Sequence, residues 1–257
     1  MMTYNTIFNI EEKIVLITGS SRGIGFTLAR AFASLGARVI MNGRTHTTLE
    51  QASRSLNALG YQTSTSLFDV FDKEAVEKEI NRIEKNTGPV DILINNAGIQ
   101  RRHPLEKCPL DEWEEVIRTN LTGAFVVSQA VVQRMIARES GKIINICSLM
   151  SELGRYTTGS YAASKGGLKM LTKAMTVEWA RYNIQINGIG PGYFLTEMTH
   201  KLADDKNFDD WIRGRTPAGR WGNPDELVGA AVFLASGASS FVNGQIIYVD
   251  GGLLSTI

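Results

Sequence analysis

Short apolar runs alternate with longer amphipathic segments along this chain. Runs such as KIVLIT and DILIN are apolar at nearly every position, which is typical of strands buried on both faces. Between the runs, apolar residues recur at helical spacing, as Leu28, Phe32 and Leu35 do. The predicted strands are residues 13–18, 38–42, 64–68, 91–95, 142–147, 185–189 and 245–249. The predicted helices are residues 23–35, 45–59, 73–85, 111–137 (bent near Gly123), 160–182 and 224–235.

This alternation of strands and helices predicts the α/β fold class. Right-handed crossovers between parallel strands place helices on both faces of the sheet. We therefore predict that residues 1–257 form a single-domain Rossmann-type doubly wound parallel sheet of about seven strands. The one long irregular stretch, residues 192–221, is rich in charged and aromatic residues, and we interpret it as a candidate substrate lid.

Composition narrows the class of protein. The chain has 27 Lys and Arg against 26 Asp and Glu, a balance that gives no reason to expect nucleic acid or an anionic membrane as a partner. Two cysteines, Cys108 and Cys147, exclude a disulfide framework and suit a reducing compartment. The N-terminal residues lack a signal-peptide pattern, and no apolar run approaches the ~18 residues that span a bilayer. We expect a soluble cytoplasmic protein.

A glycine-rich turn, TGSSRGIG at residues 18–25, joins the first predicted strand to the first predicted helix. Glycines allow a tight turn and let backbone N–H groups approach a diphosphate, which the helix dipole also favours. The spacing is GxxxGxG, and its place at the first crossover favours a nucleotide site over a plain turn. The candidate cofactor-binding residues here are Gly19, Ser21, Arg22, Gly23, Ile24 and Gly25.

The end of the second predicted strand bears on the choice between NADP and NAD. NAD sites usually place a carboxylate there for the ribose 2′-hydroxyl. This chain has Asn42-Gly43-Arg44 instead, and Arg44 could meet a 2′-phosphate, with Arg22 as a second cation. The sequence therefore predicts NADP(H) in preference to NAD(H), although both arginines could equally be solvated surface charges.

Tyr161 and Lys165 share one face of a predicted helix because they are four residues apart. An ammonium beside a phenol favours the phenolate and is expected to lower the pKa of Tyr161. A phenol tuned in this way can move a proton on or off a carbinol oxygen. Tyr and Lys at this spacing are common on ordinary helices, so the prediction rests on the glycine turn and on Ser148 as well.

These residues together resemble the short-chain dehydrogenase/reductase family over nearly the whole chain, from Lys13 to Gly252. Its motifs appear in order, and they are the glycine turn, Asp69-Val70, Asn95-Asn96-Ala97-Gly98, Asn120, Ser148, Tyr161 with Lys165, and Pro191-Gly192. One departure is Gly190, which stands where Ala is commoner before Pro-Gly-Tyr and which we expect to affect only local packing.

The resemblance implies roles for individual residues. Tyr161 would be the general acid/base, Lys165 would lower its pKa and bind the nicotinamide ribose, Ser148 would hydrogen-bond the substrate oxygen, and Asn120 would hold a water linking Lys165 to solvent. The resemblance also implies cofactor contacts from Asp69, Val70, Asn95, Ala97, Gly98, Pro191, Gly192 and Thr196. Asp69 and Val70 would contact adenine, and Thr196 would contact the carboxamide. No metal is expected, since His46, His103 and His200 form no ligand motif.

Within the family, four segments are similar to the gluconate 5-dehydrogenases, which implies NADP-dependent oxidation of D-gluconate to 5-dehydro-D-gluconate. These segments are NNAGIQRRHP, NICSLMSELG, GPGYFLTEM and RTPAGRWG. Cations near the carboxyl edge of the sheet suit an acidic, hydroxylated substrate. The candidate substrate-binding residues are Arg101, Arg102, Ser148, Glu152, Arg155 and Tyr161. For Arg101 and Arg102, salt bridging or solvation is nearly as plausible.

Alternatives remain open at this point. The same motifs serve 3-oxoacyl-thioester reduction on acyl carrier protein, and another sugar acid or polyol could be oxidised at another carbon. A nucleotide-binding regulatory protein without turnover is a further alternative, disfavoured because all four catalytic candidates are present. The family resemblance implies an oligomer, most often a homotetramer, built on residues 111–137, residues 160–182 and the C-terminal strand.

Overall fold

The computed structural model describes residues 6–256, and within that range seven strands form one parallel sheet. Their order is β3-β2-β1-β4-β5-β6-β7, and every neighbouring pair runs parallel. The strands are β1 Ile14–Ile17, β2 Arg38–Gly43, β3 Thr63–Leu67, β4 Ile92–Asn95, β5 Gly141–Ile146, β6 Ile184–Pro191 and β7 Ile246–Val249. The predicted α/β doubly wound sheet is confirmed.

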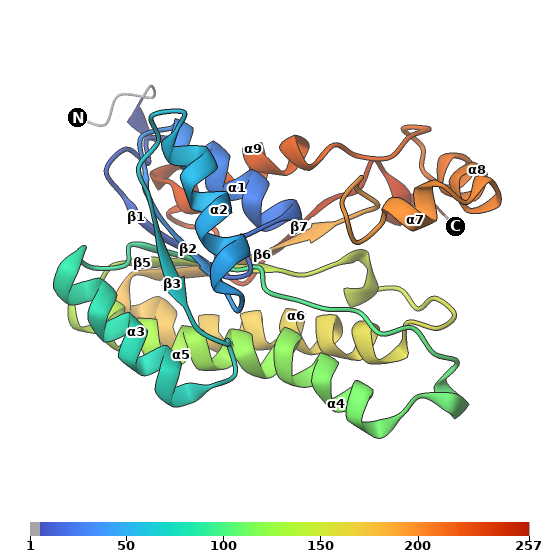
Figure 1. The fold of residues 1–257 in the computed structure, drawn as a ribbon, viewed down its shortest axis with the longest axis horizontal. Helices are drawn as coiled ribbons and strands as arrows, with labels where there is room; N and C mark the ends of the chain where they lie inside the picture. Colours follow the sequence, from blue (N-terminus) through green and yellow to red (C-terminus); the bar gives the residue numbers. More distant parts are fainter. Residues whose placement is uncertain (1–5, 257) are drawn as a thin grey trace.

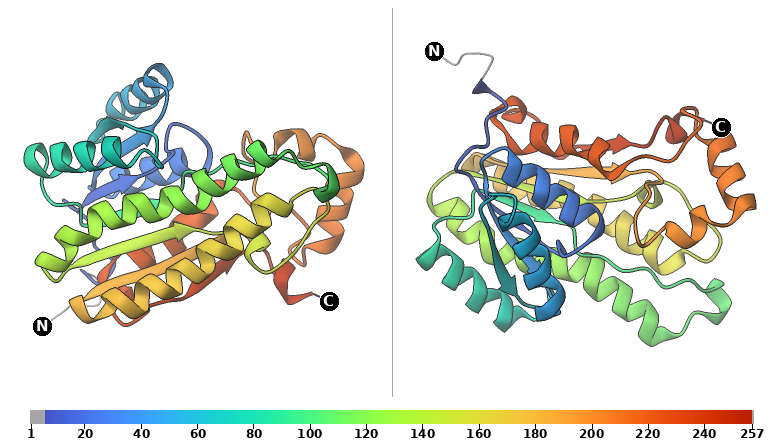
Figure 2. Two further views of the ribbon diagram at one scale, coloured as in Figure 1. Left: turned by 90° about the horizontal axis from the view of Figure 1, so that it is seen from below. Right: turned by 45° about the horizontal axis from the view of Figure 1, so that its top comes forward.

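Helices cover both faces of the sheet (Figure 1). Helices α1, α2 and α9 lie on one side, and α3, α4, α5 and α6 lie on the other, as the two turned views in Figure 2 also show. The helices are α1 Gly23–Ser34, α2 His46–Asn57, α3 Lys73–Asn86, α4 Leu110–Ile117, α5 Gly123–Ala137, α6 Gly159–Trp179, α7 His200–Ala203, α8 Lys206–Arg215 and α9 Val228–Ala235.

The core is split by the sheet into two apolar layers because successive strand residues point to opposite faces. In β1, Val15 and Ile17 pack in the cluster that contains residues of α1, α2 and α9. Leu16, the residue between them, packs in the other cluster, which contains residues of α3 and α5. All three are fully buried. A strand that must be apolar on both faces explains the continuous apolar runs of the sequence.

Strand order reverses beside β1, which pairs with β2 on one side and with β4 on the other. The connections after β1 and β4 therefore leave in opposite directions and open a crevice at the carboxyl edge of the sheet, the general place for ligands in such folds. Residues 18–25 and 96–103 lie at the ends of these two strands, so the fold brings both predicted motifs to one place.

Several predicted elements need correction. The stretch 111–137 is one helical path in three parts, because a π-helical segment, Arg118–Thr122, separates α4 from α5 at the predicted bend. The stretch 192–221 was predicted to be irregular, yet it contains α7 and α8. The final predicted helix begins as a 3₁₀ turn, Pro224–Leu227, and only then becomes α9.

Candidate active site

The glycine turn after β1 is packed too tightly for side chains at its key positions. Gly19 and Gly23 have φ of +60° and +57°, which favour glycine. A Cβ on Gly25 would lie 2.4 Å from the Asn96 side-chain amide and 2.5 Å from the Gly19 carbonyl oxygen. The turn therefore presents bare backbone at the start of the twelve-residue helix α1, as a diphosphate site requires.

Two residues that the sequence analysis assigned no contact hold this turn in place. The Asn96 amide donates to the carbonyls of Thr18 and Gly19, at 2.9 Å each. The Thr18 hydroxyl oxygen accepts from the backbone N–H groups of Asn96 and Ala97, at 2.9 and 3.0 Å. These bonds join the loop after β1 to the loop after β4 across the crevice. The Asn-Asn-Ala-Gly motif signalled them, but only the strand order shows which loop Asn96 reaches.

Asn42, at the end of β2, is a buried structural residue. Its amide donates to the carbonyls of Ser66 and Phe68, at 3.1 and 3.0 Å, and its Oδ1 accepts from the Gly19 N–H at 3.3 Å. A Cβ on Gly43 would lie 3.8 Å from Ser21 Oγ, so the end of β2 is adjacent to the glycine turn.

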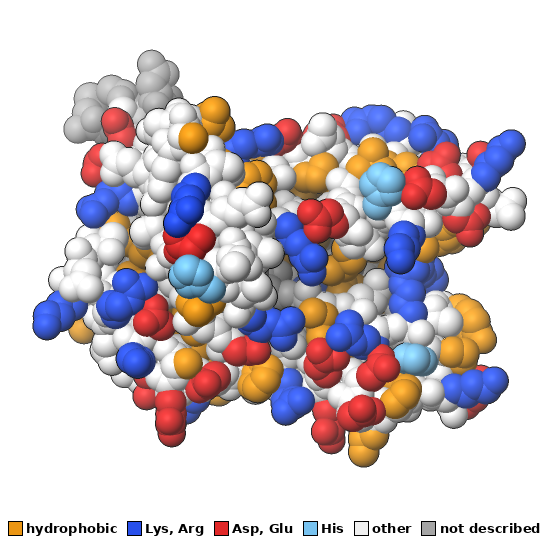
Figure 3. Space-filling view, viewed as in Figure 1, with side chains coloured by type: hydrophobic (Ala, Val, Ile, Leu, Met, Phe, Trp, Pro, Cys, Tyr) orange, Lys and Arg blue, Asp and Glu red, His pale blue; other side chains and the backbone are white. Residues whose placement is uncertain are grey.

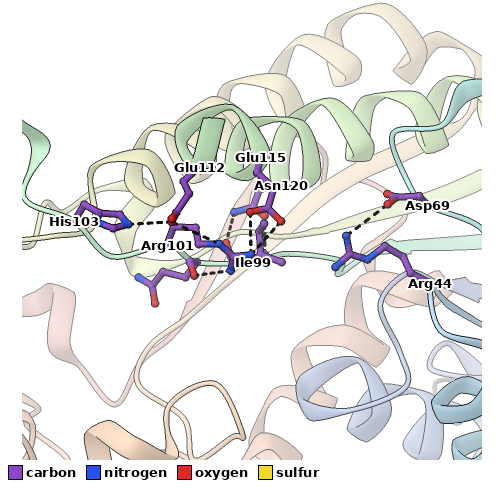
Figure 4. Close-up of polar contacts among 9 residues, drawn as sticks. Arg44, Asp69, Ile99, Arg101, His103, Glu112, Glu115 and Asn120 are labelled. Carbon is purple, nitrogen blue, oxygen red and sulfur yellow. Dashed lines mark hydrogen bonds and ion pairs between the residues drawn. The ribbon is translucent and has the colours of Figure 1, made fainter. Parts of the chain in front are cut away.

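The two predicted phosphate-binding arginines lie near the glycine turn and the end of β2, and each forms a long ion pair with an acidic residue. Arg44 lies 3.5 Å from Asp69, as Figure 4 shows, and Arg22 lies 3.5 Å from Glu197. Both arginine side chains are more than half exposed, so each pair contributes only about 0–1 kcal/mol. Asp69 Oδ1 is buried and has no hydrogen-bond partner among the described residues. Val70, beside it, is buried, and a Cβ on Gly123 would come within 2.4 Å of it.

Tyr161 and Lys165 lie one turn apart on α6, with the ammonium 5.8 Å from the centroid of the phenol ring. Burial raises the pKa of Tyr161, and its hydrogen bond with Ser148 opposes that rise. The pKa of Tyr161 was expected to fall beside Lys165, and in this structure burial makes it rise instead. The ammonium instead donates to the Ile146 carbonyl at 2.5 Å, and burial lowers the pKa of Lys165 to about 8.

Asn120 sits in the π-helical segment and is 1% exposed. Its Oδ1 accepts from the Ile99 N–H at 2.8 Å, and its amide donates to the Ile99 carbonyl at 2.9 Å (Figure 4). The same amide donates to Ser164 Oγ at 3.0 Å. A Cβ on Gly98 would lie 3.4 Å from Asn120 Oδ1 and 3.7 Å from Lys165 Nζ. The side chain of Asn120 is therefore used to join the loop after β4 to α6, close to Lys165.

Of the three candidate arginines, Arg101 already has two acidic partners. Its guanidinium lies 2.9 Å from Glu115 and 3.7 Å from Glu112, both on α4 (Figure 4). Glu112 also contacts His103 Nε2 at 2.9 Å. These contacts hold the segment after β4 against α4, so the charge of Arg101 is largely neutralised within the chain.

Arg102 and Arg155, in contrast, form no ion pair with any carboxylate of the described range. Burial, and then the neighbouring charge of Arg155, lower the pKa of Arg102. Arg155 donates to the Tyr193 hydroxyl at 3.3 Å and lies 5.0 Å from the centroid of the Phe208 ring. Arg102 donates to Gln100 Oε1 at 3.1 and 3.3 Å, so both neighbouring guanidiniums have neutral hydrogen-bond partners. Figure 3 shows the surface hollowed between the part that carries α7 and α8 and the part that carries α4, with Lys and Arg side chains at the rim.

The remaining candidates also gather at this edge of the sheet. Ser148 caps a short 3₁₀ turn, Leu149–Ser151, directly after β5. Glu152 contacts Lys169 and Tyr248, so its carboxylate is already engaged within the chain. Asn95 is buried and donates to Ser128 and Asn145, which joins β4 to β5 and α5. Pro191 ends β6, a Cβ on Gly192 would lie 2.7 Å from Asp250, and Thr196 hydrogen-bonds Thr199.

The candidate lid is held by aromatic contacts. Tyr193 meets Phe208, Trp211 and Trp221 edge to face, with ring centroids 5.8, 6.4 and 5.7 Å apart. The Trp221 indole N–H donates to Asp209 at 2.6 Å.

No cluster of three His, Cys, Asp or Glu able to hold a metal ion occurs within residues 6–256. No helix in that range is long and apolar enough to cross a membrane.

Comparison with known proteins agrees with this geometry. The sequence profile of the family described as short chain dehydrogenase matches residues 13–207. The chain belongs to the short-chain dehydrogenase family. It is 53% identical to the 5-keto-D-gluconate 5-reductase of Escherichia coli strain K12, over 98% of this chain and all of that protein. It is 52% identical to the gluconate 5-dehydrogenase of Gluconobacter oxydans, over 98% of both chains.

Solved structures of short-chain dehydrogenases have the same fold. A crystal structure of a gluconate 5-dehydrogenase from Burkholderia cenocepacia, in complex with NADP and tartrate, superimposes with a TM-score of 0.95. That protein is 52% identical to this chain, and the match covers 98% of both.

Proposed function

We propose that this short-chain dehydrogenase catalyses the reversible oxidation of D-gluconate at carbon 5, giving 5-dehydro-D-gluconate, with NADP(H) as cofactor. The observation that carries the proposal is the convergence of Tyr161, Ser148 and Lys165 with two guanidiniums at one edge of the sheet. These guanidiniums belong to Arg102 and Arg155, which form no ion pair within residues 6–256. The names of the relatives at 52–53% identity support the same substrate.

The residues of the crevice fit a dinucleotide. The cradle at Gly19 and Gly25 has no room for a Cβ, which leaves backbone N–H groups accessible to a diphosphate. Asp69 Oδ1 is a buried acceptor that has no donor among residues 6–256, and the amino group of an adenine would supply one. The other proposed cofactor contacts along this crevice are Ser21, Ile24, Val70, Ala97 and Gly98. The nicotinamide end would be contacted by Pro191, Gly192 and Thr196.

A preference for NADP rests on charge at the end of β2. None of residues 42–44 is acidic. Asn42 is buried, and its amide donates to two backbone carbonyls. Arg44 and Arg22 are free to exchange their weak partners, Asp69 and Glu197, for a phosphate, because those exposed pairs hold them loosely. A 2′-phosphate forms charge-assisted hydrogen bonds with guanidinium that a 2′-hydroxyl cannot match.

Proton transfer falls to Tyr161. The bound nicotinamide supplies a hydride acceptor in oxidation and a hydride donor in reduction. Ser148 already hydrogen-bonds the phenol and stabilises its ionised form. Lys165, whose pKa burial lowers to about 8, places its ammonium 5.8 Å from the centroid of the phenol ring, where a positive charge favours the phenolate. Asn120, whose side chain is engaged by Ile99 and Ser164, is the proposed holder of a water that would link Lys165 to solvent.

Arg102 and Arg155 are the proposed carboxylate-binding pair. Burial, and then repulsion by Arg155, lower the pKa of Arg102, and a carboxylate between the two arginines would offset both effects and could accept from both guanidiniums. Arg101 is assigned to holding α4, since Glu112 and Glu115 neutralise it. The tartrate bound by the Burkholderia cenocepacia relative, itself a hydroxylated carboxylate, supports an acidic ligand.

Initial rates from NADPH and NADH absorbance test this function. The purified protein is offered each cofactor with 5-dehydro-D-gluconate and with an acetoacetyl thioester. We expect fast turnover only with NADPH and the keto acid. The Tyr161→Phe variant should still bind NADPH, and its turnover should fall by roughly 10³-fold or more. Turnover with the thioester instead would reassign the protein to 3-oxoacyl reduction.

Arginine variants test the carboxylate site separately. Arg102→Met and Arg155→Met should each raise the KM for the keto acid by roughly 10-fold or more, because each removes a charge-assisted contact. The matched control is Arg54→Met on the exposed side of α2, which should change nothing. An unchanged KM in both site variants would refute the proposed carboxylate pair.

The assembly and location are proposals as well. Met170 and Val177 on α6 and Phe125 on α5 are exposed apolar residues, and such surface supports the homotetramer that the family resemblance implies. A cytoplasmic location follows from the predicted NADP chemistry and cysteine content and stays a prediction. Light scattering of the purified protein measures the assembly.

A further inference from the structure

Glu152 is engaged by two side chains from distant parts of the chain. Its Oε1 accepts from Lys169 Nζ at 2.5 Å and from the Tyr248 hydroxyl at 2.6 Å. Lys169 belongs to α6 and Tyr248 to β7, so one carboxylate oxygen joins three elements. The pair is partly exposed, with side-chain exposures of 24% for Lys169 and 34% for Glu152. The hydrogen bonds from Lys169 and Tyr248 lower the pKa of Glu152, which is therefore ionised at neutral pH.

A second bond ties the same segment to the same helix. Ser151 Oγ donates to the Lys165 carbonyl at 2.9 Å. Residues 161, 165 and 169 follow each other at four-residue intervals on one face of α6. The segment that begins with Ser148 is thus fastened along the helix that carries Tyr161, at the two turns that follow it.

Gly190 makes room for Tyr248. Gly190 and Tyr248 are paired across β6 and β7. A Cβ on Gly190 would lie 2.3 Å from two carbon atoms of the Tyr248 ring, far closer than packed atoms approach. The expectation that Gly190 affects only local packing is therefore too weak. Glycine at this position is what lets the ring lie where its hydroxyl reaches Glu152.

We propose that Glu152, Lys169 and Tyr248, with the space left by Gly190, form a clamp that positions Ser148 against Tyr161. This inference rests on the proposed function for its kinetic consequences. Glu152 is then a positioning residue and not a substrate ligand, because its Oε1 already accepts hydrogen bonds from Lys169 and Tyr248. The clamp acts on the phenol through Ser148, whose hydrogen bond stabilises the phenolate.

Loosening the clamp should have a defined kinetic signature. Tyr248→Phe removes one hydrogen bond without changing charge, and Gly190→Ala displaces the ring. Both should lower kcat by roughly 10-fold while NADPH affinity stays unchanged, since small misplacements of catalytic groups are costly. Tyr182→Phe and Gly229→Ala are the matched controls, because Tyr182 lies at the far end of α6 and a Cβ on Gly229 meets nothing within 4 Å.

The pH profile separates positioning from general destabilisation. Tyr161 is faced by Ser148 and Cys147 after β5, by Lys165 on α6 and by Tyr193 after β6. None of these charges changes in Tyr248→Phe. A weaker bond from Ser148 should therefore move the rise of kcat in gluconate oxidation to higher pH. Glu152→Ala removes a nearby negative charge, which by itself would move the profile to lower pH.

A double variant tests whether the members act as one unit. Glu152→Ala with Tyr248→Phe should be no worse than the more damaging single variant, because either change opens the clamp. Additive losses, an unchanged kcat and pH profile in Tyr248→Phe, or a raised substrate KM with unchanged kcat in Glu152→Ala would each overturn the proposal. The last result would return Glu152 to the substrate.

A measurement without substrate keeps the clamp distinguishable from the proposed function. Cys147 is 2% exposed, directly precedes Ser148, and has a pKa raised to about 11 by burial. In a Cys108→Ser background, its reaction with a thiol reagent should be slow and should accelerate roughly 10-fold in Tyr248→Phe and Gly190→Ala. Acceleration without gluconate turnover would reject the proposed function and retain the clamp. Unchanged labelling alongside normal turnover would reject the clamp.

Discussion

Lys142 should destabilise the folded protein at neutral pH. It lies in the inner strand β5, and its ammonium donates to Ser239 Oγ at 3.2 Å. It forms no ion pair within residues 6–256, and the nearby Asp91 carboxylate is engaged by the Ile14 N–H and by Lys13. Burial lowers the pKa of Lys142 from 10.5 to about 8. The charged form is therefore disfavoured in the folded state.

The magnitude follows from that pKa. A group fully removed from water would cost about 3 kcal/mol for such a change, and partial exposure of Lys142 reduces the expected cost to about 1–2 kcal/mol. Below a pH of about 8, both the folded and the unfolded chain hold the proton, and the full cost applies. Between about 8 and 10.5, only the unfolded chain holds it, so stability rises with pH.

Lys142→Met removes the charge and keeps the length of the side chain. It loses one hydrogen bond, worth about 1 kcal/mol, but Ser239 Oγ still donates to the Leu234 carbonyl. We expect a variant that is slightly more stable than the natural protein at neutral pH and that loses this advantage above the pKa of a free lysine. Urea denaturation across pH measures it, with exposed Lys78→Met as control. A variant that is less stable at neutral pH, or a natural protein whose stability is flat from pH 8 to 10.5, would refute the reasoning.

Three further outcomes are expected. Asn145→Ala removes bonds from Asn95 and to Thr172 at a fully buried site and should lower the free energy of unfolding by about 2–4 kcal/mol in urea titration; a loss under about 0.5 kcal/mol would contradict it. Gly25→Ala should weaken NADPH binding by roughly 10- to 100-fold in fluorescence titration, because its Cβ overlaps the turn; normal binding would show that the turn can relax. Arg44→Gln should raise the KM for NADPH by roughly 10-fold and leave that for NADH unchanged; equal effects on both would remove Arg44 from the phosphate site.

The sequence alone determined the order and type of the elements. Apolar runs such as residues 13–18 and 91–95 must be buried on both faces, and that requirement fixes a parallel sheet under two helical layers. Motif spacing along the chain likewise placed the glycine turn at residues 18–25 and the Tyr161–Lys165 pair on one helix, since both are local patterns.

Only the tertiary structure decided which partners the charged and polar side chains have. Arg101, Arg102 and Arg155 look alike in the sequence, and only the packing of α4 shows that Glu112 and Glu115 neutralise the first. Burial, which raises the pKa of Tyr161, depends likewise on residues far away in the chain. Local periodicity carries no information on contacts of this kind, because strand order and helix packing bring together segments that are separated by a hundred residues or more, as Glu152 and Tyr248 nearly are.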